Sequence, residues 1–137
     1  MQRRAFIAGA AIHAVCAYAD ERQDFTDWVG RWVAYLSAEN HSSFLRAIDR
    51  QMPGRDELET NLVAILRGRE VSSSVQIQSF DPEAGEARLD WFLNLAPRTP
   101  PGETERRRET VILKLAKQKK GWRVLHLEPL SLFRPPA

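Results

Sequence analysis

The chain has 137 residues and carries 20 Lys and Arg against 18 Asp and Glu, which is a formal net charge of +2. This length fits one domain with one hydrophobic core. A charge so close to zero does not imply the general attraction to nucleic acid of a strongly basic chain. A single cysteine, Cys16, excludes an intramolecular disulfide.

The first nineteen residues have the three-part pattern of a secretory signal peptide. A pair of arginines is followed by a short apolar run, Ala5–Val15, and by an A-x-A pattern that ends at Ala19, just before Asp20. The apolar run is too short to span a membrane stably. We therefore expect residues 1–19 to be a signal peptide and residues 20–137 to form a periplasmic or secreted bacterial domain, with no membrane span after the signal is removed.

Removal of this leader changes the charge and the cysteine content. Without Arg3 and Arg4 the domain has 18 cations against 18 anions, and it has no cysteine. Nucleic acid is therefore not an expected partner. Three alternatives to the ordinary secretory route stay open: twin-arginine export, since residues 3–7 resemble that signal; lipidation at Cys16; and a cytosolic protein whose first amphipathic helix is Arg4–Val15.

The first half of the domain has the periodicity of helices. Apolar residues follow steps of three and four from Phe25 to Leu36, and Asp24 and Ser42 are expected to cap the first two helices. Gly68 marks the end of the third. Three helices are thus predicted, over Asp24–Ser37, Ser43–Ile48 and Asp56–Arg67.

The second half has the periodicity of strands. Four strands are predicted, over Val71–Phe80, Glu86–Leu95, Arg106–Gln118 and Trp122–Phe133. In the second strand Leu89, Trp91 and Leu93 share one face, and Asp90 lies on the other. Helices followed by consecutive strands predict an α+β fold, in which the N-terminal helices pack on one face of a four-stranded antiparallel sheet.

This order of elements resembles the nuclear-transport-factor-2-like superfamily, a cystatin-like α+β fold that includes SnoaL-like polyketide cyclases and ketosteroid isomerases. The resemblance rests on the segments 42–49, Met52-Pro53-Gly54 and Leu58–Leu66, followed by the strands. It implies a cone, in which the helices pack into the concave side of a curved sheet that often encloses a pocket. It also implies two partners, a small apolar molecule in the cone and a second copy bound through the sheet.

The resemblance does not choose a reaction, because this fold carries enzymes, binding proteins and dimerising modules. The isomerase members use a carboxylate base with a tyrosine and a protonated acid. The domain has one tyrosine, Tyr35, on the first helix, so this pair cannot be carried over. The domain also has no metal-ligand cluster, since it keeps only His41 and His126 and no cysteine. No metal and no cofactor are expected.

Three polar residues are candidates for a site. Asp90 would be a base with a raised pKa if its face of the strand were concave; the alternative is a strand residue paired with an Arg or Lys across the sheet. His126 is a candidate acid–base group, against the alternative of a structural histidine. Asp49 is expected at the mouth of the cone as a ligand-binding residue, or else in an ordinary surface ion pair.

Aromatic and basic residues give two further candidates. Trp28 and Trp32 lie one helical turn apart, and with Trp91 they would form a ligand-binding wall or would simply pack in the core. The run of arginines at 106–108 would bind an anion or would be a solvated strand end.

Three functions follow from these observations. An exported, non-catalytic ligand-binding or protein-interaction module fits best, because no acid–base constellation is evident. A small-molecule cyclase or isomerase that uses Asp90 or His126 is the alternative. An auxiliary subunit of a larger exported assembly is the third.

Overall fold

Three helices precede four strands, and a short 3₁₀ helix follows them. This computed structural model describes the backbone of residues 2–136 and the side chains of residues 20–136. The order of helices and strands predicted from the sequence is confirmed. The elements are α1 (Gln2–Ser37), α2 (His41–Arg46), α3 (Arg55–Gly68), β1 (Arg69–Asp81), β2 (Glu86–Pro97), β3 (Glu105–Lys117), β4 (Trp122–Glu128) and η1 (Leu130–Phe133).

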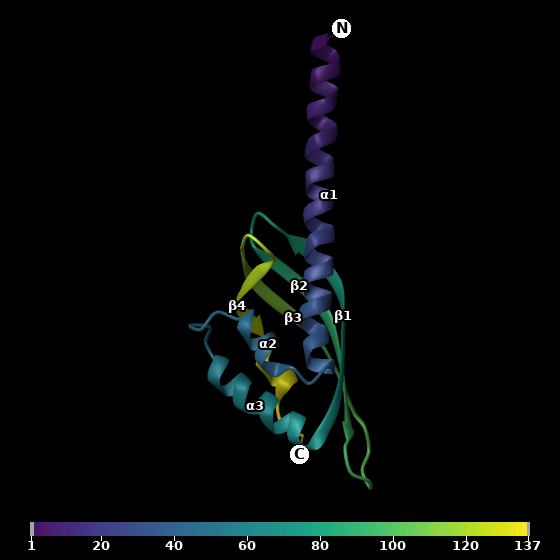
Figure 1. The fold of residues 1–137 in the computed structure, drawn as a ribbon, viewed down its shortest axis with the longest axis vertical. Helices are drawn as coiled ribbons and strands as arrows, with labels where there is room; N and C mark the ends of the chain where they lie inside the picture. The colour runs from purple at the N-terminus through teal and green to yellow at the C-terminus, as the bar shows by residue number, and fades with distance from the viewer. Residues whose placement is uncertain (1, 137) are drawn as a thin grey trace.

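The first helix is longer than predicted. It runs without a break from Gln2 to Ser37, so the prediction that Asp24 caps its N-terminus is wrong. The segment before Asp24 is rich in alanine, the strongest helix former, and contains no proline to end the helix. The C-terminal part of α1 lies along the sheet, and its N-terminal part projects well beyond the rest of the fold (Figure 1).

Most other boundaries differ from the prediction by one or two residues, and two differences have an evident local cause. The cap of α2 is Asn40 and not Ser42: the Asn40 side chain accepts a hydrogen bond of 3.1 Å from the Ser43 backbone N–H. The last strand ends at Glu128 and not at Phe133. Pro129 follows, and a proline has no N–H to donate to a sheet; the chain then turns into η1.

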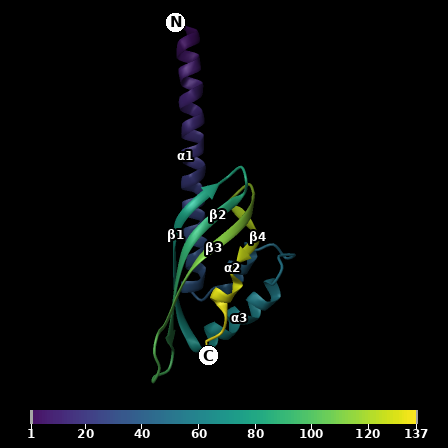
Figure 2. The same cartoon turned by 180° about the vertical axis from the view of Figure 1, so that it is seen from behind.

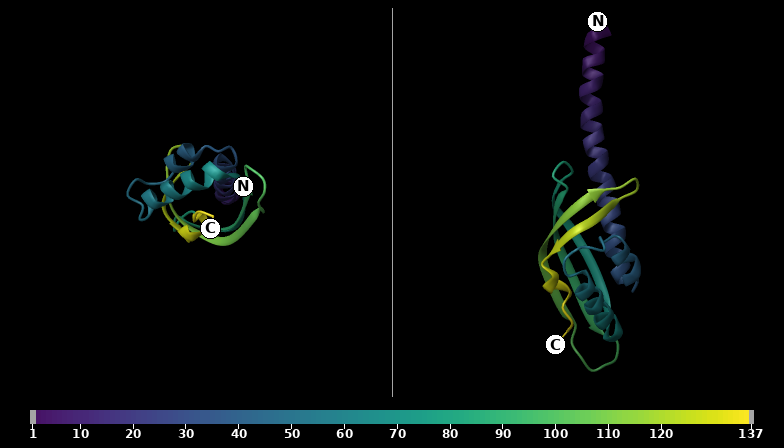
Figure 3. Two further views of the ribbon diagram at one scale, coloured as in Figure 1. Left: turned by 90° about the horizontal axis from the view of Figure 1, so that it is seen from below. Right: turned by 90° about the vertical axis from the view of Figure 1, so that its left-hand side faces the viewer.

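The four strands form one antiparallel sheet in the order β1-β2-β3-β4. The register brings Val75 opposite Trp91, Leu89 opposite Val111, and Leu113 opposite Leu127. The sheet is strongly twisted, as Figure 2 shows from behind. It curls around the helices when it is seen from below (Figure 3, left), so its concave face encloses them.

The inward face of every strand belongs to the hydrophobic core. The core combines α1, α2, α3, the concave side of the sheet and η1. The helix also holds the edge of the sheet directly, since the Ser37 hydroxyl accepts a hydrogen bond of 2.9 Å from the Ser73 backbone N–H. A curved sheet wrapped around helices is a shape that can enclose a pocket, and the side chains inside decide whether it does.

Candidate functional site

Aromatic side chains fill the interior of the cone. Trp32 stacks on Phe44 with ring centroids 4.6 Å apart. Trp91 meets Trp32 edge-on at 5.5 Å and Phe133 edge-on at 5.3 Å. Phe25 stacks on Phe80 of β1 at the other end of the core. All of these rings are almost fully buried.

Very little space remains beside these rings. A cavity of about 10 Å³ lies between α1, α3 and β2, and its lining, which includes Leu36, Leu62 and Leu93, is entirely apolar. That volume is about the size of one water molecule. A drug-sized ligand occupies a pocket of roughly 300–1,000 Å³, and even benzene occupies a cavity of about 150 Å³, so this cavity cannot hold an organic ligand.

Trp32 and Trp91, two of the three tryptophans considered for a ligand-binding wall, are core residues. Both are at most 1% exposed. The indole N–H of each is satisfied internally: Trp32 donates to the Phe44 carbonyl and Trp91 donates to the Ser73 hydroxyl, each at 2.9 Å. Their environment matches the core-packing alternative.

Trp28, the third tryptophan, lies at the surface. It is half-buried, stacks on Trp32 at 5.5 Å and tilts against Trp122 at 5.7 Å. Together with Arg31 and Tyr35 it borders a shallow surface pocket of about 210 Å³. Of the tryptophans proposed as a ligand wall, Trp28 is therefore the one that a ligand can reach without unpacking the core.

Asp90 lies on the convex face of the sheet, away from the core. Its two carboxylate oxygens accept hydrogen bonds of 3.0 and 2.8 Å from Arg108 on β3. Arg108 also lies over the Phe92 ring, 4.8 Å from its centroid. The hydrogen bonds from Arg108 hold the pKa of Asp90 below its usual value. A base with a raised pKa would need the opposite shift, so the environment of Asp90 is that of the cross-strand ion pair.

His126 is also on the convex face. It lies opposite Lys114 in the register, and its Nε2 is 3.2 Å from a carboxylate oxygen of Glu128. Asp90 lies opposite Thr110 instead. Thr110 and Lys114 are four residues apart on β3, which corresponds to about 13 Å along the strand. Since β3 also lies between β2 and β4, Asp90 and His126 are too far apart to act on one substrate as an acid–base pair.

Asp49, the third polar candidate, is held between the second helix and the last strand. Its carboxylate accepts a hydrogen bond of 2.8 Å from the Gln51 backbone N–H and one of 3.1 Å from Arg123 Nε. These two contacts, the first more than the second, hold the pKa of Asp49 below its usual value. Asp49 therefore stays ionised and fixes the side chain of Arg123.

Next to Asp49 the surface is hollowed into a pocket of about 370 Å³. Four arginines from four segments line it: Arg46 ends α2, Arg50 lies in the following loop, Arg55 begins α3, and Arg123 lies on β4. These four arginines are not predicted as a site from the sequence. The signal was weak, because three of the arginines fall within ten residues but the fourth is more than sixty residues away.

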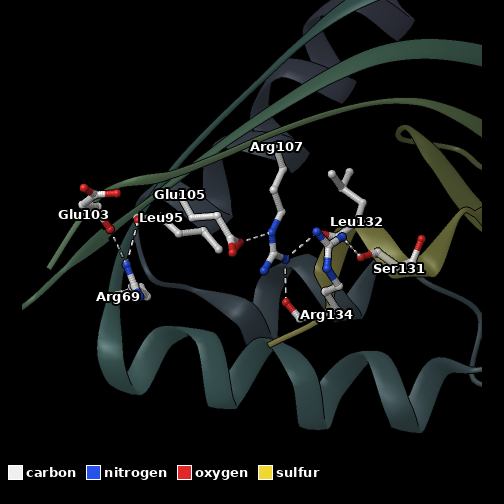
Figure 4. Close-up of polar contacts among 8 residues, drawn as sticks. All are labelled: Arg69, Leu95, Glu103, Glu105, Arg107, Ser131, Leu132 and Arg134. Atoms are coloured by element: carbon white, nitrogen blue, oxygen red, sulfur yellow. Dashed lines mark hydrogen bonds and ion pairs between the residues drawn. The ribbon is translucent and has the colours of Figure 1, made fainter. Parts of the chain in front are cut away.

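The run of arginines at 106–108 divides between the two faces of the sheet. Arg106 and Arg108 are exposed, but Arg107 is 7% exposed and points to the inside (Figure 4). It pairs with Glu105 and donates to the carbonyls of Leu132, at 2.9 Å, and Arg134. The prediction of a solvated strand end is therefore wrong for Arg107.

The period of the strand explains the buried arginine. Val111 and Leu113 face the core, and Arg107 lies four residues before Val111 on the same face. Its guanidinium fastens η1 and the following residues to the sheet. One of its terminal nitrogens, Nη2, has no hydrogen-bond partner among the described residues.

The described part of the chain has neither a metal-binding cluster nor a helix able to cross a membrane. It holds no group of three or more His, Cys, Asp or Glu side chains arranged to bind a metal ion. None of its helices combines the length and the apolar character that crossing a membrane requires.

Comparisons with known proteins identify a fold and no activity. No protein-family model matches the chain, and no curated protein matches it in sequence. A variant of Rv3472, a protein of unknown function from Mycobacterium tuberculosis, is similar in structure with a TM-score of 0.60 and 13% identity, over 82% of this chain and 72% of that one.

Two further structures are similar. A multiply substituted variant of the protein Rd1NTF2_05 has a TM-score of 0.53 and 14% identity, over 77% of this chain and 96% of that one. A protein of unknown function with a cystatin-like fold from Nostoc punctiforme has a TM-score of 0.47 and 18% identity, over 77% and 86%. The chain has the α+β fold of the nuclear-transport-factor-2-like proteins.

Proposed function

We propose that the chain is a non-catalytic binding module that holds its ligand or partner on its outer surface and not inside the cone. The observation that carries this proposal is the filled interior. Trp32, Phe44, Trp91 and Phe133 occupy the place where a ligand would enter, and about 10 Å³ remains beside them.

The positions of the two catalytic candidates support the same proposal. Asp90 is engaged by Arg108 and has a lowered pKa, and His126 lies on a different part of the convex face, beside Glu128. An acid–base reaction needs a group that holds or releases its proton within reach of a bound substrate. Neither side chain borders the interior, so the cyclase or isomerase alternative lacks a located base.

A small apolar probe tests whether the interior is closed. Thermal unfolding of the wild type and of Trp91→Ala is measured with and without indole. The variant lacks the indole ring of Trp91 and so contains a cavity of that shape. We expect indole to raise the unfolding temperature of the variant only, because an apolar cavity binds an apolar molecule of its own size.

The same experiment can contradict the proposal. Saturable binding of indole, or of the neutral dye Nile red, to the wild type would mean that the cone opens to ligands. Binding of Nile red is measured on the wild type alone, so this test does not depend on the folding of the variant.

We also propose that the domain is exported and that its mature form begins near Asp20. The signal-peptide pattern of the first nineteen residues supports this. Among the described side chains of α1, the first fully buried one is Phe25, so a cut before Asp20 leaves the core intact. The mass of the protein from its native host tests the proposal, and an intact chain that begins at Met1 would contradict it.

Dimerisation through the sheet stays a prediction. The convex face carries exposed charges, among them Arg88 and Lys114, which would have to be paired across such an interface. Sedimentation equilibrium of the wild type and of Phe92→Glu, which places a charge in the middle of that face, measures whether a dimer forms there.

A further inference from the structure

A basic pocket of about 370 Å³ lies between α2, the start of α3 and β4. Its lining combines four arginines, Arg46, Arg50, Arg55 and Arg123, with one acidic residue, Glu59. From here on this is called the arginine pocket. It opens to solvent on the outside of the fold, and its floor includes the core residues Leu45 and Ile48.

Two of the four arginines are fixed in place by the backbone and by a carboxylate. Arg55 is half-buried and donates to the carbonyl of Leu45 at 3.1 Å and to that of Ile48 at 3.4 Å. Arg123 is half-buried and donates through Nε to Asp49 at 3.1 Å. These bonds use only part of each guanidinium fork, which has five N–H donors. The remaining donors are held ready at the edge of the pocket.

The other two arginines are exposed. Within the described part of the chain, neither Arg46 nor Arg50 has a hydrogen-bond or ion-pair partner from its side chain. They lie on either side of Asp49, one at the end of α2 and one in the loop. The pocket thus has two fixed cationic groups and two free ones that can close on a bound anion.

The balance of charge indicates the kind of anion. Four guanidinium groups meet two carboxylates, Glu59 in the lining and Asp49 beside Arg123, which leaves an excess of two positive charges. A phosphate group carries about −1.5 to −2 charges at neutral pH and offers several acceptor oxygens. The planar fork of arginine matches these oxygens in pairs. A single carboxylate would neutralise only half of the excess.

The size of the pocket leaves room for more than a free ion. A volume of about 370 Å³ lies in the range of small-molecule sites, roughly 300–1,000 Å³. We propose that the arginine pocket binds a phosphate group, either free or as the monoester of a small molecule whose remainder occupies the rest of the pocket. This deepens the proposed function, because it rests on binding at the outer surface and names the chemical class of the ligand.

Titration of the wild type with three probes tests the site and distinguishes the two sources of the phosphate. The probes are inorganic phosphate, phenyl phosphate and the singly charged benzoate. Binding of each probe is measured by calorimetry and by the shifts of the backbone amide NMR signals. We expect both phosphates to bind saturably. If the natural ligand is a monoester, phenyl phosphate should bind more tightly than inorganic phosphate; if it is the free ion, the two affinities should be equal. Benzoate should bind at least tenfold more weakly than phenyl phosphate. The shifted amides should lie in residues 42–59 and around Arg123.

Matched variants locate the binding. The double variant Arg46→Gln, Arg50→Gln should bind both phosphates at least tenfold more weakly. It should stay folded, because within the described part of the chain these two side chains form no hydrogen bond or ion pair. Arg88→Gln, which removes an exposed arginine from the convex sheet face, should leave the affinity unchanged. Absence of saturable binding to the wild type, or an equal loss in Arg88→Gln, would overturn the site.

The indole signals separate this proposal from the closed cone. If phenyl phosphate shifts the Nε1–H signals of Trp32 and Trp91, its ring enters the interior and the surface-binding function fails. If those signals stay fixed while the amides of the arginine pocket shift, both proposals stand. If nothing shifts, the arginine pocket is overturned, and the closed interior is still judged separately by the indole experiment.

Discussion

Replacement of Trp91 by alanine tests the packing of the cone most directly. Trp91 has no exposed surface and meets the rings of Trp32, Phe44 and Phe133 at centroid distances of 5.5, 6.1 and 5.3 Å. Truncation of a buried tryptophan to alanine costs about 3–5 kcal/mol. Loss of the hydrogen bond from its indole to Ser73 adds about 1 kcal/mol. We expect a total loss of about 4–6 kcal/mol of the free energy of unfolding.

Urea denaturation of the wild type and of three variants measures this loss. Trp91→Phe keeps most of the packing and loses the hydrogen bond, so it should cost about 1–2 kcal/mol. Tyr35→Ala removes an aromatic ring that is 38% exposed, and should change stability by less than about 0.5 kcal/mol. A loss below about 1 kcal/mol in Trp91→Ala, at an unchanged denaturant slope, would refute the idea that the interior is closely packed.

Three other changes test single features of the fold. Asp90→Asn should leave the chain folded and should reduce the loss of stability at low pH. Because Arg108 lowers the pKa of Asp90 in the folded state, the ion pair stabilises the fold above about pH 4 and loses this effect as the pH falls. Unfolding temperatures measured between pH 7 and pH 3 would contradict this if those of the wild type and the variant declined in parallel. Gly121→Ala should cost about 1–3 kcal/mol, since Gly121 has a φ of +84° and a methyl group there would meet an indole ring of α1; an unchanged urea midpoint would contradict the geometry of this turn. Arg107→Met should speed proteolytic cleavage after residue 129, because Arg107 fastens that segment through backbone carbonyls; mass spectrometry of the digest should show no such change for the exposed Arg106→Met.

The fold could be predicted because its signals are periodic and local. Steps of three and four in the first half, and of two in the second, are consequences of burying one face of each helix or strand. The boundaries were less accurate because competing local groups decide them. Asn40 takes the cap that Ser42 was expected to provide, and an alanine-rich stretch carries α1 through Asp24.

The surface features could not be predicted in the same way. The arginine pocket joins residues 46–55 to Arg123, and the pairing of residues 47–49 with Val124 on β4 brings them together. The convex position of Asp90 depends on which face of the sheet the helices cover, which the alternation of one strand does not decide. Arg107 is different, because its alignment with Val111 and Leu113 was a signal in the sequence that it faces inward, although the run of arginines was predicted to bind an anion or to be solvated.

The filled interior has a consequence for stability. The chain has a single cysteine, so packing must provide what an intramolecular disulfide would otherwise add. An empty cavity of about 300 Å³ would cost roughly 7 kcal/mol, at about 24 cal/mol for each Å³ of cavity volume. That is comparable with the whole free energy of unfolding of an ordinary domain, about 5–15 kcal/mol. Aromatic rings in the cone avoid this cost. The exposed arginines Arg46 and Arg50 of the arginine pocket can therefore be replaced without loss of the core.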